Sequence, residues 1–216
     1  MKCLADHPRA GFDDSKASQI NNLTIMTHGL PASLNLGGGY FYNTDIPDFG
    51  QTVHGYVNRS KLRVQLYACN TARKPNTEEA WLDRRTNGVV YEHDPFVNGE
   101  GSFAQLLQVE MGPETTVFGH TTKGHLSINY AARCYGKMAN GAVNGKHMFD
   151  VYFPQSFVAE QAQRLNQSED TVRTSMFDYY KLQEPNTFAG DNSGRDTFME
   201  PEKKGQSMRN GWLSRN

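Results

Sequence analysis

Two stretches of sequence decide the fold: LTIMTHG, residues 23–29, and LRVQLYACNTAR, residues 62–73. Each opens with a short apolar run rich in branched side chains and ends near a reactive one, His28 in the first and Cys69 in the second. Such runs are typical of buried strands in a parallel sheet. Because the carboxyl ends of neighbouring parallel strands line one edge of a sheet, we expect an α/β fold that brings His28 and Cys69 to that edge.

Further elements of an α/β fold follow from the spacing of apolar residues. Ser102 can cap a helix over 103–109, and Gly112-Pro113 can end it. The polar segment 74–100 is expected to be a long surface loop. The same spacing predicts helices over 48–58 and 155–182 and strands over 115–118 and 146–153.

The chain length of 216 residues suits one domain with polar ends. Residues 1–22 are polar and without periodicity, so we expect an N-terminal arm. The folded domain is expected over 23–185. Residues 186–216 contain few apolar side chains and are expected to form a polar C-terminal tail without catalytic residues.

Composition excludes several classes of partner. A net charge of -1 with 37% hydrophobic residues does not suit a nucleic-acid-binding surface. No apolar run reaches the roughly 20 residues that span a membrane, and the first residues lack the apolar core of a signal peptide. We therefore expect the protein to be made in the cytoplasm of its producer. If it is exported, the export route does not use a cleaved signal peptide. Three scattered cysteines do not describe a disulfide framework, and the oligomeric state stays open.

The residue types at the two strand ends suit thiol catalysis. A cysteine nucleophile needs a base and a pair of N–H groups that bind the oxyanion. His28 can be the base and Cys69 the nucleophile. Gly29 has no Cβ to block a substrate carbonyl, so its N–H and that of Cys69 can form the oxyanion hole.

An apolar block followed by His-Gly, and a later apolar block followed by Ala-Cys, resembles the caspase-like superfamily of cysteine peptidases. This superfamily includes caspases, legumain, clostripain, gingipains, separase and self-cleaving domains of bacterial toxins. The later GSFAQLLQVEMG, followed by TTVFGH, is similar to the bacterial members, and the resemblance covers about residues 23–120. The chain departs from larger relatives in having little sequence before the His-Gly strand, where a strand and a helix usually come first.

The resemblance implies a three-layer sandwich, in which helices flank a mainly parallel sheet, and a His28–Cys69 dyad without metal or cofactor. The implied activity is that of a cysteine endopeptidase acting on protein or peptide substrates, in the setting of a toxin, an effector or a self-processing domain. Specificity then depends on a pocket for the residue before the cut bond. The acidic candidates for that pocket are Asp45, Asp48, Glu92 and Asp94, and an apolar pocket is equally open.

Other interpretations compete with this one. His54-Gly55 is a second His-Gly pair, but it lacks a preceding strand. His120 and His125 could join Cys69 or Cys134 in a metal site, although the spacing of a zinc motif is missing. Gly37 to Gly39 resemble a phosphate-binding loop only loosely, and Cys3 has no strand-end partner. The same fold could also serve as a non-catalytic peptide-binding module or as an acyl or peptidyl transferase.

Overall fold

The computed structural model describes residues 20–73, 82–83, 88–89, 99–121, 131–138, 141–183 and 201–216. Within these residues a five-stranded sheet has the order β1-β5-β8-β9-β10. Strands β1, β5 and β8 are parallel, and β9 runs antiparallel to both of its neighbours, so β10 points the same way as the first three. The strands are β1 (Asn22–Met26), β5 (Arg63–Tyr67), β8 (Thr116–His120), β9 (Ala132–Met138) and β10 (Gly141–His147).

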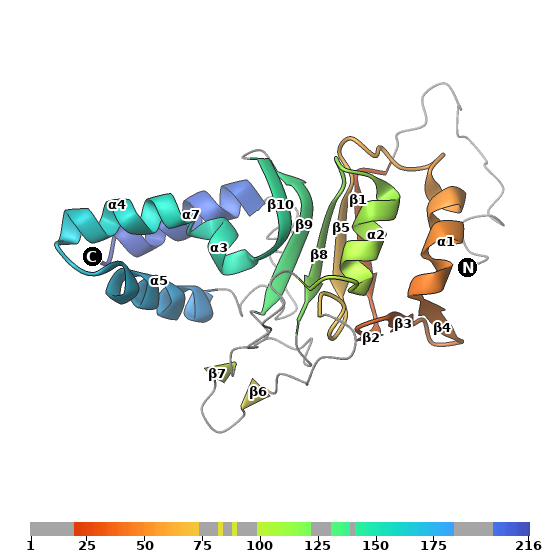
Figure 1. Ribbon diagram of the computed structural model, residues 1–216, viewed down its shortest axis with the longest axis horizontal. Coiled ribbons are helices and arrows are strands. Elements are labelled where there is room, and N and C mark those ends of the chain that lie inside the picture. Colours follow the sequence, from red (N-terminus) through yellow and green to blue (C-terminus); the bar gives the residue numbers. More distant parts are fainter. Residues whose placement is uncertain are drawn as a thin grey trace.

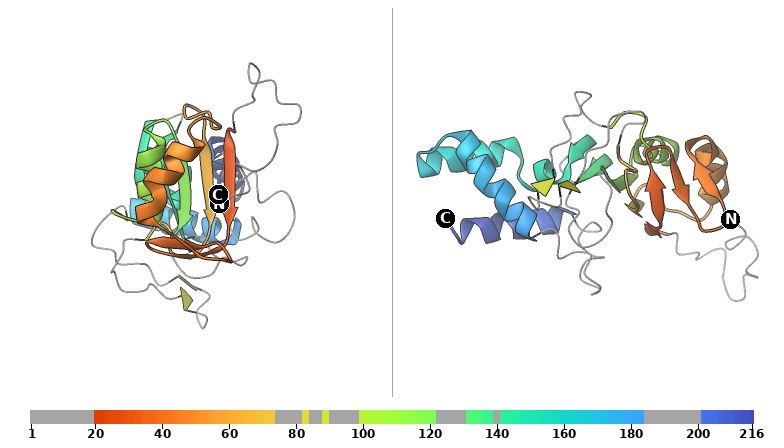
Figure 2. Two further views of the ribbon diagram at one scale, coloured as in Figure 1. Left: turned by 90° about the vertical axis from the view of Figure 1, so that its right-hand side faces the viewer. Right: turned by 90° about the horizontal axis from the view of Figure 1, so that it is seen from below.

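Helices lie on both sides of this sheet (Figure 1). Helices α1 (Ile46–Val53) and α2 (Phe103–Met111) pack on one face, where Leu66 and Val117 point. A second helical group packs against the opposite face beside β10, where Tyr67 and Phe118 point. This group holds α3 (Met148–Tyr152), α4 (Gln155–Leu165), α5 (Glu169–Gln183) and α7 (Pro201–Leu213). The expected α/β fold with a mainly parallel sheet is therefore confirmed, and Figure 2 shows that the molecule is elongated along the line from α1 to α4.

Strand β1 differs from the expectation, because it is an edge strand and not a buried one. Leu23 and Ile25 are half-buried against the core under α1, whereas Thr24 and Met26 are exposed, Met26 by 68%. Among the described residues, only β5 pairs with β1 along its length. The neighbouring strand β5 is buried on both faces, as its sequence predicts.

The prediction of a strand over 146–153 is wrong beyond His147. Strand β10 ends there, and the helix α3 begins at Met148. The imidazole Nδ1 of His147 accepts a hydrogen bond from the N–H of Phe149 at 3.1 Å and so caps the helix. Met148, Phe149 and Tyr152 are then buried on one side. A short apolar run fits a strand or a helix equally well, which is why the sequence pattern misleads.

Residues 201–216 belong to the fold, which corrects the expectation of a polar tail over 186–216. Helix α7 buries Met208 and Trp212 in the core beside α3 and α5. The indole N–H of Trp212 donates to the Ser175 hydroxyl at 3.2 Å, and Arg209 donates to the carbonyl of Tyr152 at 2.7 Å. Two buried apolar side chains four residues apart anchor this polar helix.

A second, three-stranded antiparallel sheet follows β1 directly. It consists of β2 (His28–Leu30), β3 (Ser33–Asn35) and β4 (Tyr40–Tyr42), and a 3-10 turn (Asn43–Asp45) leads from it into α1. Gly29, Leu34 and Phe41 form its buried face. Gly37 to Gly39 lie at the tip between β3 and β4, where a Cβ would meet nothing within 4 Å.

The predicted surface loop 74–100 falls mostly outside the described residues. Inside it, the two-residue strands β6 (Leu82–Asp83) and β7 (Gly88–Val89) pair with each other. The predicted helix over 155–182 is confirmed as two helices, α4 and α5, which are separated at Asn166 in a left-handed conformation with φ 53°. No helix in the described ranges is both long and apolar enough to cross a bilayer.

Candidate active site

The pairing of β1 with β5 brings the two predicted reactive residues to the same place. Met26 lies beside Tyr67 in the parallel register, and the N–H of Thr27 donates to the carbonyl of Tyr67 at 3.2 Å. The paired register ends there, and His28 and Cys69 each lie two positions further along their own segment. His28 is the first residue of β2, and Cys69 begins the turn that follows β5. Both residues therefore lie at neighbouring carboxyl ends of parallel strands.

The backbone of Gly29 packs directly against the turn that carries Cys69. A Cβ added to Gly29 would lie 2.6 Å from the carbonyl oxygen of Cys69 and 2.8 Å from side-chain carbons of both Ala68 and Thr71. These separations are too short for real contacts, so the position requires glycine. The glycine predicted from the His-Gly motif is thus a close neighbour of the predicted nucleophile.

The pairing of β2 with β3 also sets the direction of the Gly29 N–H. Leu30 and Ser33 are paired across a two-residue turn that starts with Pro31. The two residues that flank a two-residue turn form N–H to carbonyl hydrogen bonds in both directions. Along an antiparallel ladder, such hydrogen-bonded pairs alternate with pairs that are not hydrogen-bonded. Gly29 and Leu34 are therefore a non-bonded pair. The N–H of Gly29 points away from β3 and is not used by the β2–β3 ladder.

The residues after Cys69 form a tightly held turn. Asn70 is left-handed, with φ 57°, and its carbonyl accepts a hydrogen bond from the N–H of Arg73 at 3.0 Å. Ala72 donates to the carbonyl of His120 on β8 at 2.9 Å, and the carbonyl of Thr71 accepts from the first turn of α2 at 2.8 Å. The side chain of Cys69 is half-buried, whereas the four residues after it are buried. A cysteine that is partly accessible to solvent is thus held by a well-bonded turn.

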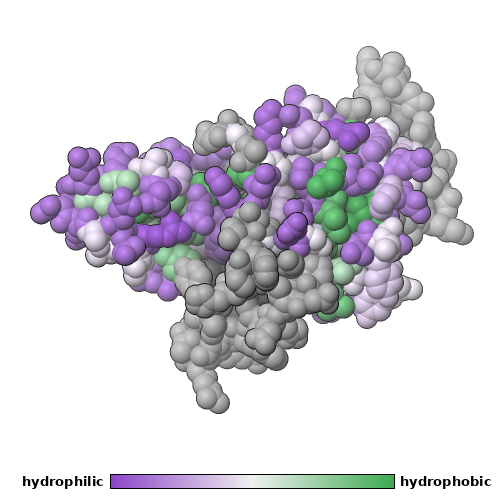
Figure 3. All heavy atoms as spheres, viewed as in Figure 1, coloured by the Kyte–Doolittle hydropathy of each residue, from purple (hydrophilic) through white to green (hydrophobic). Residues whose placement is uncertain are grey.

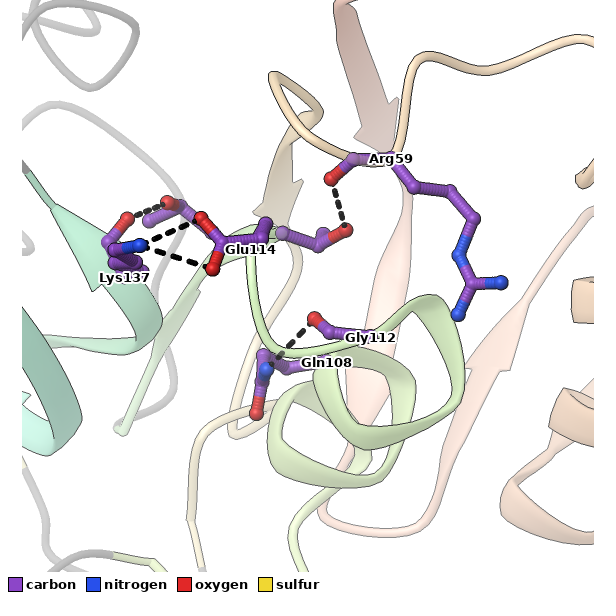
Figure 4. A network of polar contacts seen from close by, with 7 residues as sticks. Arg59, Gln108, Gly112, Glu114 and Lys137 are labelled. Carbon is purple, nitrogen blue, oxygen red and sulfur yellow. Dashed lines mark hydrogen bonds and ion pairs between the residues drawn. The ribbon is translucent and has the colours of Figure 1, made fainter.

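Helix α2 spans the sheet from the Cys69 turn to the opposite end. The predicted cap is confirmed, because the Ser102 hydroxyl accepts a hydrogen bond from the N–H of Gln105 at 3.3 Å. The helix ends at Gly112, as predicted, with φ 103°. There, Arg59 donates to the carbonyl of Met111 at 2.8 Å and Gln108 donates to that of Gly112 at 3.0 Å. The polar contacts around this end are drawn in Figure 4.

The competing histidine, His54, lies at the wrong end of the sheet. It follows the last turn of α1, and its Nε2 is 3.9 Å from the carboxylate of Glu110. Glu110 lies six residues after Ala104, the α2 residue that bonds the Cys69 turn. At 1.5 Å per residue, these two positions are separated by about 9 Å along the helix axis. His54 therefore lies near the end of α2 that is remote from the Cys69 turn.

Cys134 and His120 occupy buried positions in the sheet. Cys134 lies in β9, and its burial raises the pKa of its thiol far above the usual range, against a smaller lowering by Arg63. A protonated, buried thiol is a poor nucleophile. His120 ends β8 and is 2% exposed, with its ring centroid 6.4 Å from that of Tyr67. In the part of the chain that the structure describes, no three side chains among His, Cys, Asp and Glu gather as a metal site would require.

The four acidic residues proposed for a specificity pocket differ in their positions in the structure. The carboxylate of Asp45 accepts a hydrogen bond from the N–H of Tyr42 at 2.8 Å and so supports the turn into α1. Asp48 is exposed in the first turn of α1. Glu92 and Asp94 lie outside the described residues, as do Cys3 and His125.

Sequence reasoning missed Asn70. Asn70 is 1% exposed, and its Oδ1 has no hydrogen-bond partner among the described residues. The signal was present in the sequence, since asparagine is enriched in left-handed conformations and comes directly after the cysteine.

No family model, curated protein or solved structure matches this chain. What the site can do therefore follows from its own residues. A half-buried cysteine, an exposed histidine at the start of β2 and a backbone N–H outside the β2–β3 ladder are groups of the kinds that acyl transfer to a cysteine uses.

Proposed function

We propose that the chain is a cysteine endopeptidase of the caspase-like type, with Cys69 as nucleophile and His28 as general acid and base. The observation that supports this proposal is the β1–β5 register, which ends at Met26 and Tyr67, two residues before His28 and Cys69. The contact of Gly29 with the Cys69 turn adds a second support, because the backbone that follows His28 packs against that turn. Helices on both sides of a mainly parallel sheet are compatible with the three-layer sandwich of this superfamily.

The proposed reaction needs no group beyond these residues. A peptide lies across the sheet edge, and the thiolate of Cys69 attacks the carbonyl carbon of the bond to be cut. The N–H groups of Gly29 and Cys69 bind the oxyanion. His28 protonates the amine as the C–N bond breaks, and the acyl group stays on sulfur. The imidazole then accepts a proton from water, which attacks the thioester and releases the acid.

Context enters the proposal as well. The proposed setting is that of a toxin, an effector or a domain that processes its own precursor. The substrates of the peptidase are then proteins or peptides, and the chain is made in the cytoplasm of its producer.

Covalent labelling tests the proposed function. The purified chain is incubated with a set of peptide acyloxymethyl ketones that differ in the residue next to the ketone, and the labelled residue is mapped by mass spectrometry. We expect label on Cys69, and we expect Cys69→Ala to lose both labelling and peptide cleavage while it keeps its circular dichroism spectrum. Normal cleavage by Cys69→Ala would overturn the proposal.

Product analysis distinguishes the alternatives. Free acids at the new carboxyl end indicate hydrolysis, whereas products joined to an added amine indicate a transferase. Saturable binding of peptides without any product would instead indicate a non-catalytic binding module.

A further inference from the structure

The outer face of the β2–β4 sheet carries His28 together with three exposed apolar or aromatic residues. The register places His28, Asn35 and Tyr40 in one row across the strands, and Leu30, Ser33 and Tyr42 in the next. Side chains alternate along a strand, and Gly29, Leu34 and Phe41 occupy the buried face. Both rows therefore belong to the opposite face, the one that His28 shares.

This outer face exposes three large apolar or aromatic side chains, whereas Ser33 in its second row is buried. Leu30 is 49% exposed, Tyr40 53% and Tyr42 49%. The two tyrosine rings stack with centroids 5.8 Å apart at 27° between planes. In Figure 3 the surface over β2–β4 is mostly pale purple with green at one edge, whereas darker purple predominates over the helical group. None of the six residues in the two rows is Asp, Glu, Lys or Arg.

The size of this face suits a short peptide segment. Adjacent strands lie about 4.8 Å apart, so Tyr40 is on the order of 10 Å from His28 across the sheet. A stable protein interface needs roughly 800 Å² on each partner, which three exposed side chains do not provide. Two or three residues of an extended chain would cover the face.

The proposed chemistry sets which part of the substrate reaches it. The acyl part of the substrate becomes bound to Cys69, while the amine part leaves with the proton from His28. His28 opens β2, the first strand of this face, and the next residue, Gly29, packs against the Cys69 turn. The residues that follow the cut bond therefore extend over this face.

We propose that Leu30, Tyr40 and Tyr42 bind the first residues after the cut bond and select large apolar or aromatic side chains there. This inference rests on the proposed function. Tyrosine rings bind such side chains through stacking and contact area while their hydroxyl groups remain in water. A face with no acidic or basic residue apart from His28 offers no attraction to a charged side chain at these positions.

A cleavage library tests the proposal. Peptides from a digested proteome are treated with the wild-type chain and with Tyr40→Ser/Tyr42→Ser, and mass spectrometry reads the residues on both sides of each cut. We expect the wild type to enrich Leu, Ile, Met, Phe, Tyr and Trp at the first two positions after the cut, and the double variant to lose that enrichment. For a peptide selected from the library, the kcat/KM of the double variant should be at least tenfold lower than that of the wild type. The preference before the cut should not change.

Two controls separate the possible failures. Leu182→Ser removes an apolar side chain that is even more exposed, by 65%, on α5, and this variant should cleave like the wild type. An amide substrate with a small fluorescent amine after the cut bond should be cleaved equally by all three proteins. Cleavage that depends on Cys69 but shows the same preference in the wild type and the double variant would overturn this inference alone. Absence of any cleavage that depends on Cys69 would overturn the proposed function and this inference with it.

Discussion

Gly29 is in direct contact with the backbone of Cys69: a Cβ at position 29 would lie 2.6 Å from the carbonyl oxygen of Cys69. Gly29→Ala must therefore push the Cys69 turn away from β2. We expect a loss of roughly 100-fold in kcat/KM, because a displacement near 1 Å is enough for that effect. We also expect a destabilisation of about 1–3 kcal/mol from overpacking. Gly38→Ala is the matched control, since a Cβ there meets nothing within 4 Å. Equal activity of the two variants would contradict this prediction.

The two His-Gly pairs predict opposite results for two alanine variants. His28→Ala should lower kcat by a factor of about 10²–10⁴, the usual contribution of a general acid and base. His54→Ala should keep most of the activity, because His54 lies at the Glu110 end of α2. Steady-state kinetics on one peptide measures both. A greater loss in His54→Ala would transfer the base to His54.

Alkylation should distinguish the two cysteines in the described part of the sheet. Cys69 is half-buried, whereas Cys134 is fully buried and its pKa is raised by that burial. We expect iodoacetamide at neutral pH to modify Cys69 at least tenfold faster in the native protein. Residue-resolved mass spectrometry follows each site, and 6 M guanidinium should make the two rates similar. Equal native rates would contradict the described burial.

The left-handed Asn70 makes a prediction about the turn after the nucleophile. An alanine at φ 57° costs about 1–2 kcal/mol, whereas glycine adopts this conformation without that cost. Asn70→Ala should therefore unfold at a lower urea concentration than Asn70→Gly. The rate at which iodoacetamide modifies Cys69 should change in the same order. If the two variants unfold at the same midpoint, the turn does not need the left-handed residue.

His147 should make stability fall in acid. Burial lowers the pKa of His147 to about 4, with Arg133 and Arg173 adding to the effect and Asp150 opposing it. The unfolded chain binds this proton near pH 6.5, before the folded chain does, so folding loses stability as the pH falls from about 6.5 to about 4. Protonation would also remove the Nδ1 acceptor that caps α3.

Urea midpoints at pH 7, 6, 5 and 4 measure this effect. His147→Asn keeps a side chain able to cap a helix and has no group that titrates in this range. Its midpoint should fall less than that of the wild type between pH 6.5 and pH 4. Parallel curves for the two proteins would assign the acid sensitivity to other groups.

Several features of the fold followed from local pattern alone. The apolar runs before His28 and Cys69 predicted β1 and β5, and Ser102 and Gly112 predicted both ends of α2. These features depend on residues that are close together in the sequence, and secondary-structure propensity and helix capping act over that range. The His-Gly and Ala-Cys motifs also identified His28 and Cys69 as the candidate reactive residues.

Tertiary contacts decided what those patterns left open. The exposed face of β1, the helix at Met148 and the burial of Trp212 depend on which surfaces meet, and the same apolar residue suits an edge or a core until its neighbours are placed. His28 and His54 carry the same motif. The missing strand before His54 already favoured His28, and the tertiary structure adds that His54 lies beside Glu110 at the far end of α2. Strand pairing joins residues 41 positions apart, Met26 with Tyr67, and no local sequence signal specifies such a distance. The chemistry of each residue is therefore local, whereas its partner is set by long-range packing.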